Sequence, residues 1–534
     1  MSFYEHMQQI NLQLGTSFRR TAPPASPAFN SPSVEIEPDE TACPGRSELT
    51  ALLLSALERE KVSYCHWKSN WRIDEWLAGD GDLDLLVERR DLNVFAFVLA
   101  RLGFKKALVP PRADLPGIVN FYGYDAGLRK FIHIHAHYQL VLGHDASKNY
   151  RLPIERSVLA SSRLQDSIRQ PSPEMELAIF IVRMTLKYSA PEYLARRATG
   201  NLGELRRNIR NEYHFLSDLI DPIRFGDTIR QILPTVDPRL LNDCGRALLL
   251  DMSAARMSRL RRKLERALES QSRTAIVRER SKRAVKAVSA AVVKMRLKTP
   301  NRKRLESGGS LVAVVGGDGS GKSTCTSDLH RWLGKRFETH LVHLGMPPKS
   351  ALTIASIGGV RLQRLHAAVW GFFRGRAPES FDPFNPDINL IQRIRWLCTA
   401  RDRYRLYKKL RRFASNGAIV LCDRFPTGKL SRMDAPRIER SLDGRQPTRI
   451  ERFLIEKERS YYQRILPPDQ LIVLRVEPEI AIERKLDEPT EHVSIRSKEL
   501  WDANWSDTHA KLVDAGQPRE KVIDEVRSLV WAEL

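Results

Sequence analysis

The run Gly316-Gly-Asp-Gly-Ser-Gly-Lys-Ser323 constrains the fold of this chain more than any other segment. The apolar stretch LVAVVG leads directly into it, and the helical pattern CTSDLHRWLGKRF follows it. Glycines at this spacing let the backbone turn so tightly that several N–H groups point inward, and the next helix adds the positive end of its dipole. The segment therefore predicts a buried strand, a tight loop and a helix in direct succession.

The same run satisfies G-x-x-x-x-G-K-[ST], the spacing of a loop that binds the phosphates of a nucleoside triphosphate. Lys322 would place its charge on the outer phosphates, and Ser323 would offer its hydroxyl to Mg²⁺. A chance glycine turn is the alternative, but the strand pattern before the loop and the helical pattern after it argue against that. We expect ATP and Mg²⁺ as cofactors, and the expected ATP-binding residues are Gly316, Asp318, Gly319, Ser320, Gly321, Lys322, Ser323 and Thr324.

The last third of the chain alternates apolar strand patterns with helical patterns. The strand patterns are LVAVVG, THLVHLG, GAIVLCDRF and DQLIVLRVE. Such alternation predicts an α/β domain, here residues 308–534, with a parallel sheet that carries helices on both faces.

Two charged residues end one of these strands. Asp423 and Arg424 close the pattern GAIVLCDRF, at the carboxyl edge where open α/β sheets bind ligands. A carboxylate at that edge can hold Mg²⁺ or its waters, and an arginine can clamp a phosphate with two hydrogen bonds. We therefore expect both side chains in the catalytic site.

Three further arginines are candidates for the same site. Arg403 lies on the helical pattern before that strand, where a surface salt bridge is the alternative reading. Arg484 follows the strand LIVLRVE, and Arg496 lies beyond the polar segment DEPTEHVS, which is typical of a mobile lid. Arginines on a lid can stabilise the charge on a phosphoryl group in transfer, whereas ordinary surface charge is the alternative for Arg496.

Taken together, these motifs resemble the thymidylate kinase family over about residues 310–534. The loop GGDGSGKST, the helix TARDRYRLYKKL with Asp402-Arg403, the strand IVLCDRF and the segment PPDQLIVLRVEPEIAIERK occur in the family's order, with Arg484 as the matched arginine. The resemblance implies a P-loop kinase that moves the ATP γ-phosphate to a nucleoside monophosphate or a similar phosphorylated acceptor. It also implies that Arg403 meets the acceptor's phosphate and that the chain forms a homodimer.

The chain departs from that family where the acceptor is bound. HLGMPPKS stands in place of the family's Arg-Glu-Pro-Gly run, and PTGKLSRMDAPRI replaces a serine-containing helix. Phosphoryl transfer from ATP is therefore better supported than dTMP as the acceptor, and the segment with Asp434 could contact a different acceptor.

The N-terminal half carries a second candidate site on the alternating strand pattern DLDLLVE. Period two places Asp82 and Asp84 on one face, an arrangement that suits two Mg²⁺ ions on a triphosphate. The segment from Ser63 to Gly143 resembles nucleotidyltransferases, with His133 where the third carboxylate is expected. It predicts an α+β domain over residues 47–170; a solvated carboxylate pair is the alternative.

Three histidines alternate along the later strand pattern FIHIHAHYQL. His133, His135 and His137 share one face and could hold Zn²⁺ or another transition metal. A half-exposed polar strand face is the alternative reading.

The charge is concentrated in one stretch. The chain carries +23, and residues 256–304 contain 18 Lys/Arg against 3 acids, so 18 − 3 = +15 lies there. Such a block indicates an acidic partner, either nucleic acid, anionic lipid or an acidic protein surface, whereas a solvated helical linker is the alternative. We expect a disordered tail over residues 1–46 and a helical, basic linker over residues 171–305.

The six scattered cysteines lack metal-ligand spacing, which favours reduced thiols and a cytoplasmic protein. No apolar run long enough to span a membrane is present. Two functions stay open beside the kinase: a bifunctional protein with nucleotidyltransferase activity in its N-terminal half, and a nucleotide-dependent switch that binds an acidic polymer.

Overall fold

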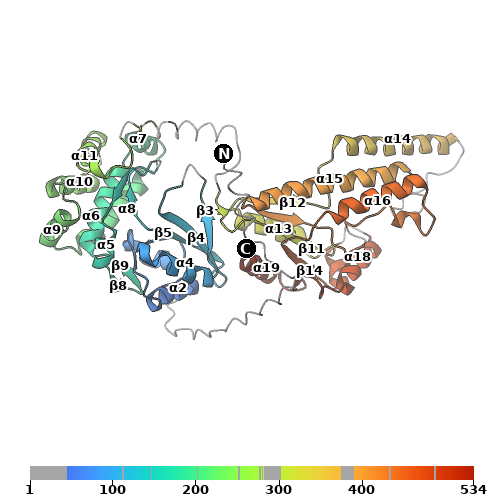
Figure 1. The fold of residues 1–534 in the computed structure, drawn as a ribbon, viewed down its shortest axis with the longest axis horizontal. Helices are drawn as coiled ribbons and strands as arrows, with labels where there is room; N and C mark the ends of the chain where they lie inside the picture. Colours follow the sequence, from blue (N-terminus) through green and yellow to red (C-terminus); the bar gives the residue numbers. More distant parts are fainter. Residues whose placement is uncertain are drawn as a thin grey trace, which may run out of the picture. The chain divides into compact units, whose positions relative to one another are not determined.

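A computed structural model describes the chain from Gly45 to Leu534, which forms one compact unit with two main sheets (Figure 1). Residues 111–113, 146, 201, 251–252, 276–277, 280, 282–284, 286–301, 374–389, 432–433 and 486–488 are not described within it. The predicted tail falls outside the described residues except for its last two positions. One of these, Arg46, lies 2.9 Å from Asp74 and thus belongs to the folded unit.

The first sheet has six strands in the order β1-β2-β5-β4-β3-β10. Strands β2 and β5 are parallel, and the other neighbours are antiparallel. A turn joins β4 to β5, with Asp125 opposite Lys130. The strands are β1 (Tyr64–His66), β2 (Asp82–Val87), β3 (Lys105–Leu108), β4 (Ile118–Asp125), β5 (Lys130–His137) and β10 (Arg304–Leu305).

Helices α2 (Glu48–Arg59), α3 (Ile73–Leu77) and α4 (Leu92–Arg101) pack on one face of this sheet. Their buried residues, such as Leu53 and Phe95, meet Leu83, Leu85 and Ile134 from the strands. The alternation along β2 thus sends Leu83 and Leu85 into this core and its two aspartates to the other face.

The predicted linker is helical, but it is not a linker. Helix α6 is apolar on nearly all sides, so its neighbours enclose it and build a separate hydrophobic core. The strand β10 at its end joins the first sheet. Between β5 and β10 the chain forms β6 (Leu140–Leu142), β7 (Tyr150–Leu152), α5 (Glu155–Ser161), β8 (Arg163–Gln165), β9 (Ile168–Gln170), α6 (Pro173–Lys187), α7 (Ala190–Ala198), α8 (Leu202–Ser217), α9 (Pro222–Ile232), α10 (Pro238–Leu250) and α11 (Ala254–Ala267).

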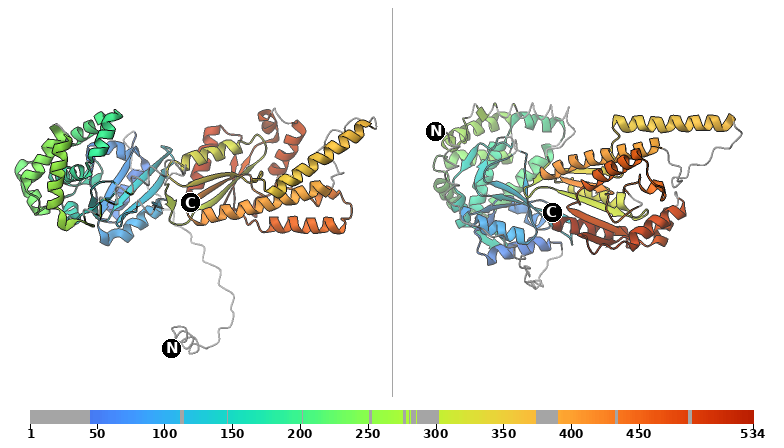
Figure 2. Two further views of the ribbon diagram at one scale, coloured as in Figure 1. Left: turned by 90° about the horizontal axis from the view of Figure 1, so that it is seen from above. Right: turned by 45° about the vertical axis from the view of Figure 1, so that its right-hand side comes forward.

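The second sheet is entirely parallel, in the order β12-β13-β11-β14-β15, so the predicted parallel sheet is confirmed. Two buried clusters cover its faces, one with α13 and α19 and the other with α15. Helices α15 and α16, orange in Figures 1 and 2, lie side by side. The elements are β11 (Ser310–Gly316), α13 (Lys322–Leu333), β12 (Thr339–His343), α14 (Ala351–Phe373), α15 (Leu390–Ser415), β13 (Ile419–Asp423), α16 (Arg449–Gln463), β14 (Gln470–Arg475), α17 (Pro478–Arg484), α18 (Thr490–Asp502), β15 (Ala510–Asp514) and α19 (Arg519–Glu533).

One aromatic cluster contains residues of both sheets' domains. Phe131 of β5 stacks on Trp332 of α13 with ring centres 4.7 Å apart, and Trp531 of α19 lies 5.1 Å from Phe131. The indole N–H of Trp531 also donates to the carbonyl of Gly103, at 3.2 Å. The two halves therefore share a buried core. Among the described residues, no helix is both long and apolar enough to cross a membrane.

We expect Phe337→Ala to lower the free energy of unfolding by about 3–5 kcal/mol. Phe337 is fully buried, and its ring contacts Tyr122, Phe131 and Trp531. Phe97 on α4 is 59% exposed and provides the matched control, since Phe97→Ala should change stability by no more than about 0.5 kcal/mol. Urea unfolding followed by tryptophan fluorescence measures both, and equal losses would contradict the shared core.

Candidate functional site

The glycine-rich loop connects β11 to α13, as its sequence predicts. Gly319 and Gly321 have φ of 75° and 81°, a left-handed conformation that favours glycine. A side chain at Gly316 would begin 2.4 Å from Ser320 Oγ, so the loop closes only with glycine there. The loop is therefore shaped by its sequence to bring its backbone around a small anionic group.

Lys322 is folded back over this loop and is almost fully buried. Its ammonium donates to the carbonyl of Gly317, at 2.5 Å. Burial, followed by the nearby charge of Arg424, lowers the pKa of Lys322 to about 8. A buried ammonium with one backbone acceptor is well placed to bind phosphate oxygens, which would stabilise its charge.

Ser323 and Asp423 meet beside the loop because β11 and β13 run in parallel with Val314 opposite Asp423. The Ser323 hydroxyl donates to Asp423 Oδ2, at 2.7 Å. The other oxygen, Oδ1, is buried and has no hydrogen-bond partner among the residues that the structure describes. A buried carboxylate oxygen next to a hydroxyl fits the oxygen ligands that Mg²⁺ prefers, so the expected metal ligands are close together.

Asp318 in the loop forms ion pairs with two arginines from other segments. Its carboxylate is buried, and it lies 3.0 Å from Arg496 of α18 and 3.4 Å from Arg424 after β13. Arg424 has φ of 67°, an unusual conformation for a residue other than glycine. The structure therefore brings Arg424 and Arg496 to the phosphate-binding loop, where the sequence predicts both of them.

Arg403 lies in the second part of the site and is buried rather than exposed on its helix. Its guanidinium forms an ion pair with Asp434, at 3.0 Å, and donates to the carbonyls of Leu344 and Gly345 just after β12. It also contacts the hydroxyl of Tyr462. A surface salt bridge is thus excluded for Arg403, and Tyr462 is a neighbour that no sequence motif indicates.

The position of Gly345 shows how closely this second part adjoins the first. A Cβ atom at Gly345 would lie 2.9 Å from Asp434 Oδ1 and 3.1 Å from Arg424 Cδ. Since Arg424 also faces Asp318, a continuous set of charged side chains runs from Arg403 to the loop. Two phosphorylated ligands could bind along this set.

Arg484 lies elsewhere, which corrects its expected place beside Arg496. It ends α17, and its guanidinium donates to the carbonyls of Ala515 and Gly516, at 2.8 and 3.4 Å. Both carbonyls follow β15, and the two hydrogen bonds hold the Arg484 side chain next to that strand. Thr324, the last expected loop residue, is exposed on the first turn of α13.

In the N-terminal domain the two predicted metal ligands of β2, Asp82 and Asp84, have different hydrogen-bond partners. Parallel pairing of β2 with β5 places Asp82 opposite His133 and Asp84 opposite His135. His133 Nδ1 lies 2.6 Å from Asp82 Oδ1, and the His133 ring stacks on the ring of Tyr122. Asp82 thus pairs with His133, while Asp84 lies opposite His135; that Asp82, Asp84 and His133 hold metal together stays a prediction.

Asp84 belongs to a second, deeper cluster. His135 Nδ1 and His137 Nε2 lie 3.0 and 3.3 Å from Asp84 Oδ1, and Lys68 Nζ lies 2.9 Å from the same oxygen. Burial by itself raises the pKa of Asp84, but Lys68 and the two histidines outweigh it and bring that pKa well below its usual value. Asp84 is therefore held as a carboxylate.

The turn before β2 is held from the helical part of the chain. Asn70 donates its backbone and side-chain N–H groups to Glu176 of α6, at 3.1 and 2.7 Å, and Ser69 donates to Glu212 of α8, at 3.3 Å. Burial raises the pKa of Glu176 to about 7. Two acidic side chains from the helical region thus hold the turn at Ser69 and Asn70.

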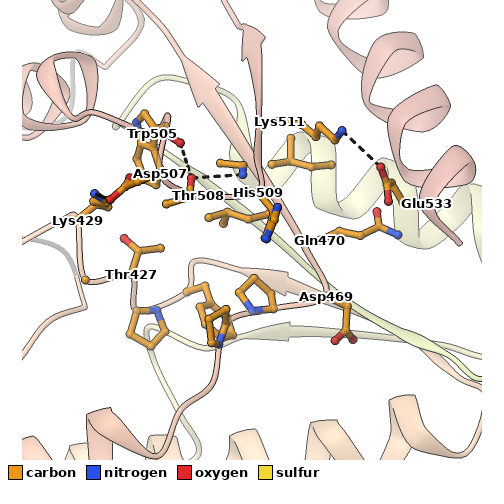
Figure 3. A pocket seen from close by; sticks show the side chains of 18 of the residues that line it. Thr427, Lys429, Asp469, Gln470, Trp505, Asp507, Thr508, His509, Lys511 and Glu533 are labelled. Atoms are coloured by element: carbon orange, nitrogen blue, oxygen red, sulfur yellow. Dashed lines mark hydrogen bonds and ion pairs between the residues drawn. The ribbon is translucent and has the colours of Figure 1, made fainter. Parts of the chain in front are cut away.

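A cavity of about 750 Å³ opens near the start of β14 and β15. Figure 3 shows Lys511 facing Glu533 across 3.4 Å, and Lys429 beside Asp507. None of the loop residues 316–324 lines this cavity. It is therefore separate from the triphosphate site.

No protein-family model matches the chain. Two curated relatives come from Escherichia coli strain K12. The chain is 28% identical over 229 residues to the uncharacterized ATP-binding protein YghR, a match that covers 41% of this chain and 86% of the relative. It is 27% identical over 182 residues to the uncharacterized ATP-binding protein YghS, with coverage of 33% and 73%.

A solved structure of deoxyadenosine kinase from M. mycoides with bound dATP aligns with 41% of this chain and 98% of that chain, at 15% identity and a TM-score of 0.24. The chain therefore has homologues named as ATP-binding proteins, in agreement with the loop. The parallel sheet with a glycine-rich loop after β11 is consistent with a P-loop fold.

We expect Asp318→Asn to loosen α18, because the neutral amide no longer pairs with Arg496. Loss of this partly exposed ion pair should cost about 1–2 kcal/mol, so amide hydrogen exchange in α18 should quicken roughly 5- to 30-fold. Asp328→Asn is the matched control, since Asp328 pairs with Arg527 of α19 at 2.7 Å. It should affect α19 and leave α18 unchanged; the same response in both variants would contradict the assignment.

Proposed function

We propose that residues 308–534 transfer the γ-phosphate of Mg·ATP to a phosphorylated small molecule, with a nucleoside monophosphate as the first candidate acceptor. One observation carries the proposal. The hydroxyl of Ser323 and the unpartnered oxygen of Asp423 lie beside a phosphate-binding loop, and a continuous set of arginines leads from that loop to a second anion site. A protein that only binds ATP does not need the second site.

The loop side of the site holds the donor. The ammonium of Lys322 exchanges the Gly317 carbonyl for the outer phosphates. The negative charge of these phosphates keeps the ammonium protonated. Ser323 and Asp423 would hold Mg²⁺, which neutralises charge on the phosphates when bound. The homologues named as ATP-binding proteins support ATP as the donor.

Arg424 and Arg496 stabilise the phosphoryl group during transfer. Both are paired with Asp318 in the structure, so they are already close to the loop and need only small side-chain rotations to reach a γ-phosphate. Electrostatic stabilisation by groups positioned before the reaction is commonly the largest contribution to phosphoryl transfer.

The second part of the site holds the acceptor. Arg403 binds the acceptor's phosphate by exchanging its contacts with Tyr462 and Asp434 for phosphate oxygens. Asp434, which is buried beside Arg403, accepts a hydrogen bond from a hydroxyl or amino group of the acceptor, because a second anionic group there would be repelled. This combination selects an acceptor with both a phosphate and a nearby donor.

Nucleotidyl transfer by the N-terminal domain lacks comparable support. Asp82 pairs with His133 while Asp84 pairs with Lys68, His135 and His137, so each carboxylate already has positively charged or histidine partners. A nucleotide-dependent switch is the remaining alternative to the kinase. It would hydrolyse ATP at a rate that no acceptor increases.

We expect release of ADP from Mg·ATP to be stimulated by at least one nucleoside monophosphate, and Lys322→Ala to reduce that rate by at least about 100-fold. Lys511→Ala is the matched control, because Lys511 lies near the start of β15 and pairs with Glu533. A coupled assay across the common monophosphates measures both variants. ATP hydrolysis that no monophosphate accelerates would contradict the nucleoside monophosphate as acceptor.

We expect Arg403→Ala to raise the KM for the acceptor by roughly 10- to 100-fold and to leave ATP affinity nearly unchanged, because a charge-assisted contact to the acceptor phosphate is lost. Arg405→Ala removes an exposed arginine from the same helix and should behave like the wild type. Steady-state kinetics with each substrate varied in turn measures the KM for the acceptor and the KM for ATP separately. A loss confined to ATP binding would place Arg403 on the donor side instead.

A further inference from the structure

The face of the first sheet opposite helices α2, α3 and α4 carries a compact group of three potential metal ligands. Asp84 of β2 and His135 and His137 of β5 point to one place because the two strands are parallel and in register. Asp84 and His137 are 8% and 3% exposed, so the group is not an ordinary solvated strand face.

The distances among the three ligand atoms match those of a tetrahedral metal site. Asp84 Oδ1 lies 3.0 Å from His135 Nδ1 and 3.3 Å from His137 Nε2, and the two ring nitrogens are 3.3 Å apart. A tetrahedron with metal–ligand bonds of about 2.0–2.1 Å has edges of about 3.3–3.4 Å. The three atoms therefore already form one face of such a tetrahedron.

Hydrogen bonds alone do not satisfy this group well. If both ring nitrogens carry protons to donate to Asp84, two donors face each other across 3.3 Å. If one is deprotonated, only the other can donate to Asp84, and the deprotonated nitrogen has its lone pair directed into the same small space. The remaining nitrogen of His137, Nδ1, is buried and has no hydrogen-bond partner among the residues described.

Lys68 indicates the charge that this place favours. Its ammonium lies 2.9 Å from Asp84 Oδ1, at the open side of the group, so a positive charge is already held against the same oxygen. A bound cation would replace the ammonium as the partner of Asp84.

We propose that Asp84, His135 and His137 bind one divalent first-row transition-metal ion. Two imidazole nitrogens and one carboxylate oxygen favour ions such as Zn²⁺ over Mg²⁺, which prefers oxygen ligands. The site differs from the two-Mg²⁺ arrangement that the sequence suggested, because His133 and Asp82 pair with each other instead. The proposal is independent of the kinase activity.

The test uses the full chain without a histidine tag, stripped with a chelator and titrated with Co²⁺ under visible absorption, then with Zn²⁺ by calorimetry. We expect one Co²⁺ per chain with the strong absorption of a four-coordinate ion, and displacement by Zn²⁺ but not by excess Mg²⁺. A spectrum as weak as that of aqueous Co²⁺, or displacement by Mg²⁺, would overturn the site.

Substitutions locate the ion. Loss of a contact outside the ligand shell typically weakens metal affinity by about 10- to 100-fold. His135→Ala and His137→Ala each remove a ligand and should weaken Co²⁺ affinity by more than that. His133→Gln and Lys322→Ala should bind Co²⁺ like the wild type, which separates this site from the Asp82 pair and from the ATP site. Unchanged affinity in both histidine-to-alanine variants, with circular dichroism intact, would show that the ion binds elsewhere.

A further variant cannot be mistaken for misfolding because it gains affinity. Lys68→Met removes the competing ammonium and should tighten Zn²⁺ binding on the order of 10-fold. Lys130→Met is its matched control, since Lys130 pairs with Asp80 at 2.6 Å rather than with Asp84. Equal affinity in the wild type and Lys68→Met would contradict the proposed place of the ion.

Discussion

The parallel pairing of β11 with its two neighbours is the constraint on which the C-terminal half depends. Strand β11 is buried along its whole length, and its pairing with β13 fixes where Asp423 lies relative to the loop. The pairing of β12 with β13 places His343 opposite Asp423, so the segment that reaches Arg403 starts at the same edge. Donor and acceptor parts of the proposed site are therefore positioned by one sheet register.

Much of this arrangement could be predicted from sequence because it depends on local patterns. The loop needs glycines at fixed places, and buried parallel strands need continuous apolar runs, so both are visible in the sequence. The roles of Arg484 and His133 could not be predicted in the same way. Their positions depend on which carbonyls are free after β15 and on the pairing register of β2 with β5, and neither leaves a periodic signal.

The helical region shows a different limit of sequence reading. Its high positive charge indicated an acidic partner, with a solvated helical linker as the alternative, but charge describes only the exposed side of a helix. On α11 the residues Met257, Leu260 and Leu264 are buried on one side, while arginines occupy much of the remainder. A basic amphipathic helix and a basic linker share the same composition, and only the spacing of the apolar residues separates them.

Lys303 shows how the two candidate sites are physically related. Its backbone carbonyl accepts from Glu338 in the C-terminal half, at 2.9 Å, while its ammonium reaches Asn120 and His133 in the first sheet, at 2.8 and 3.4 Å. Burial lowers the pKa of Lys303 to about 8. Lys303 therefore joins the two sheets in addition to the aromatic cluster around Phe131, because its backbone pairs beside the second sheet while its side chain pairs within the first.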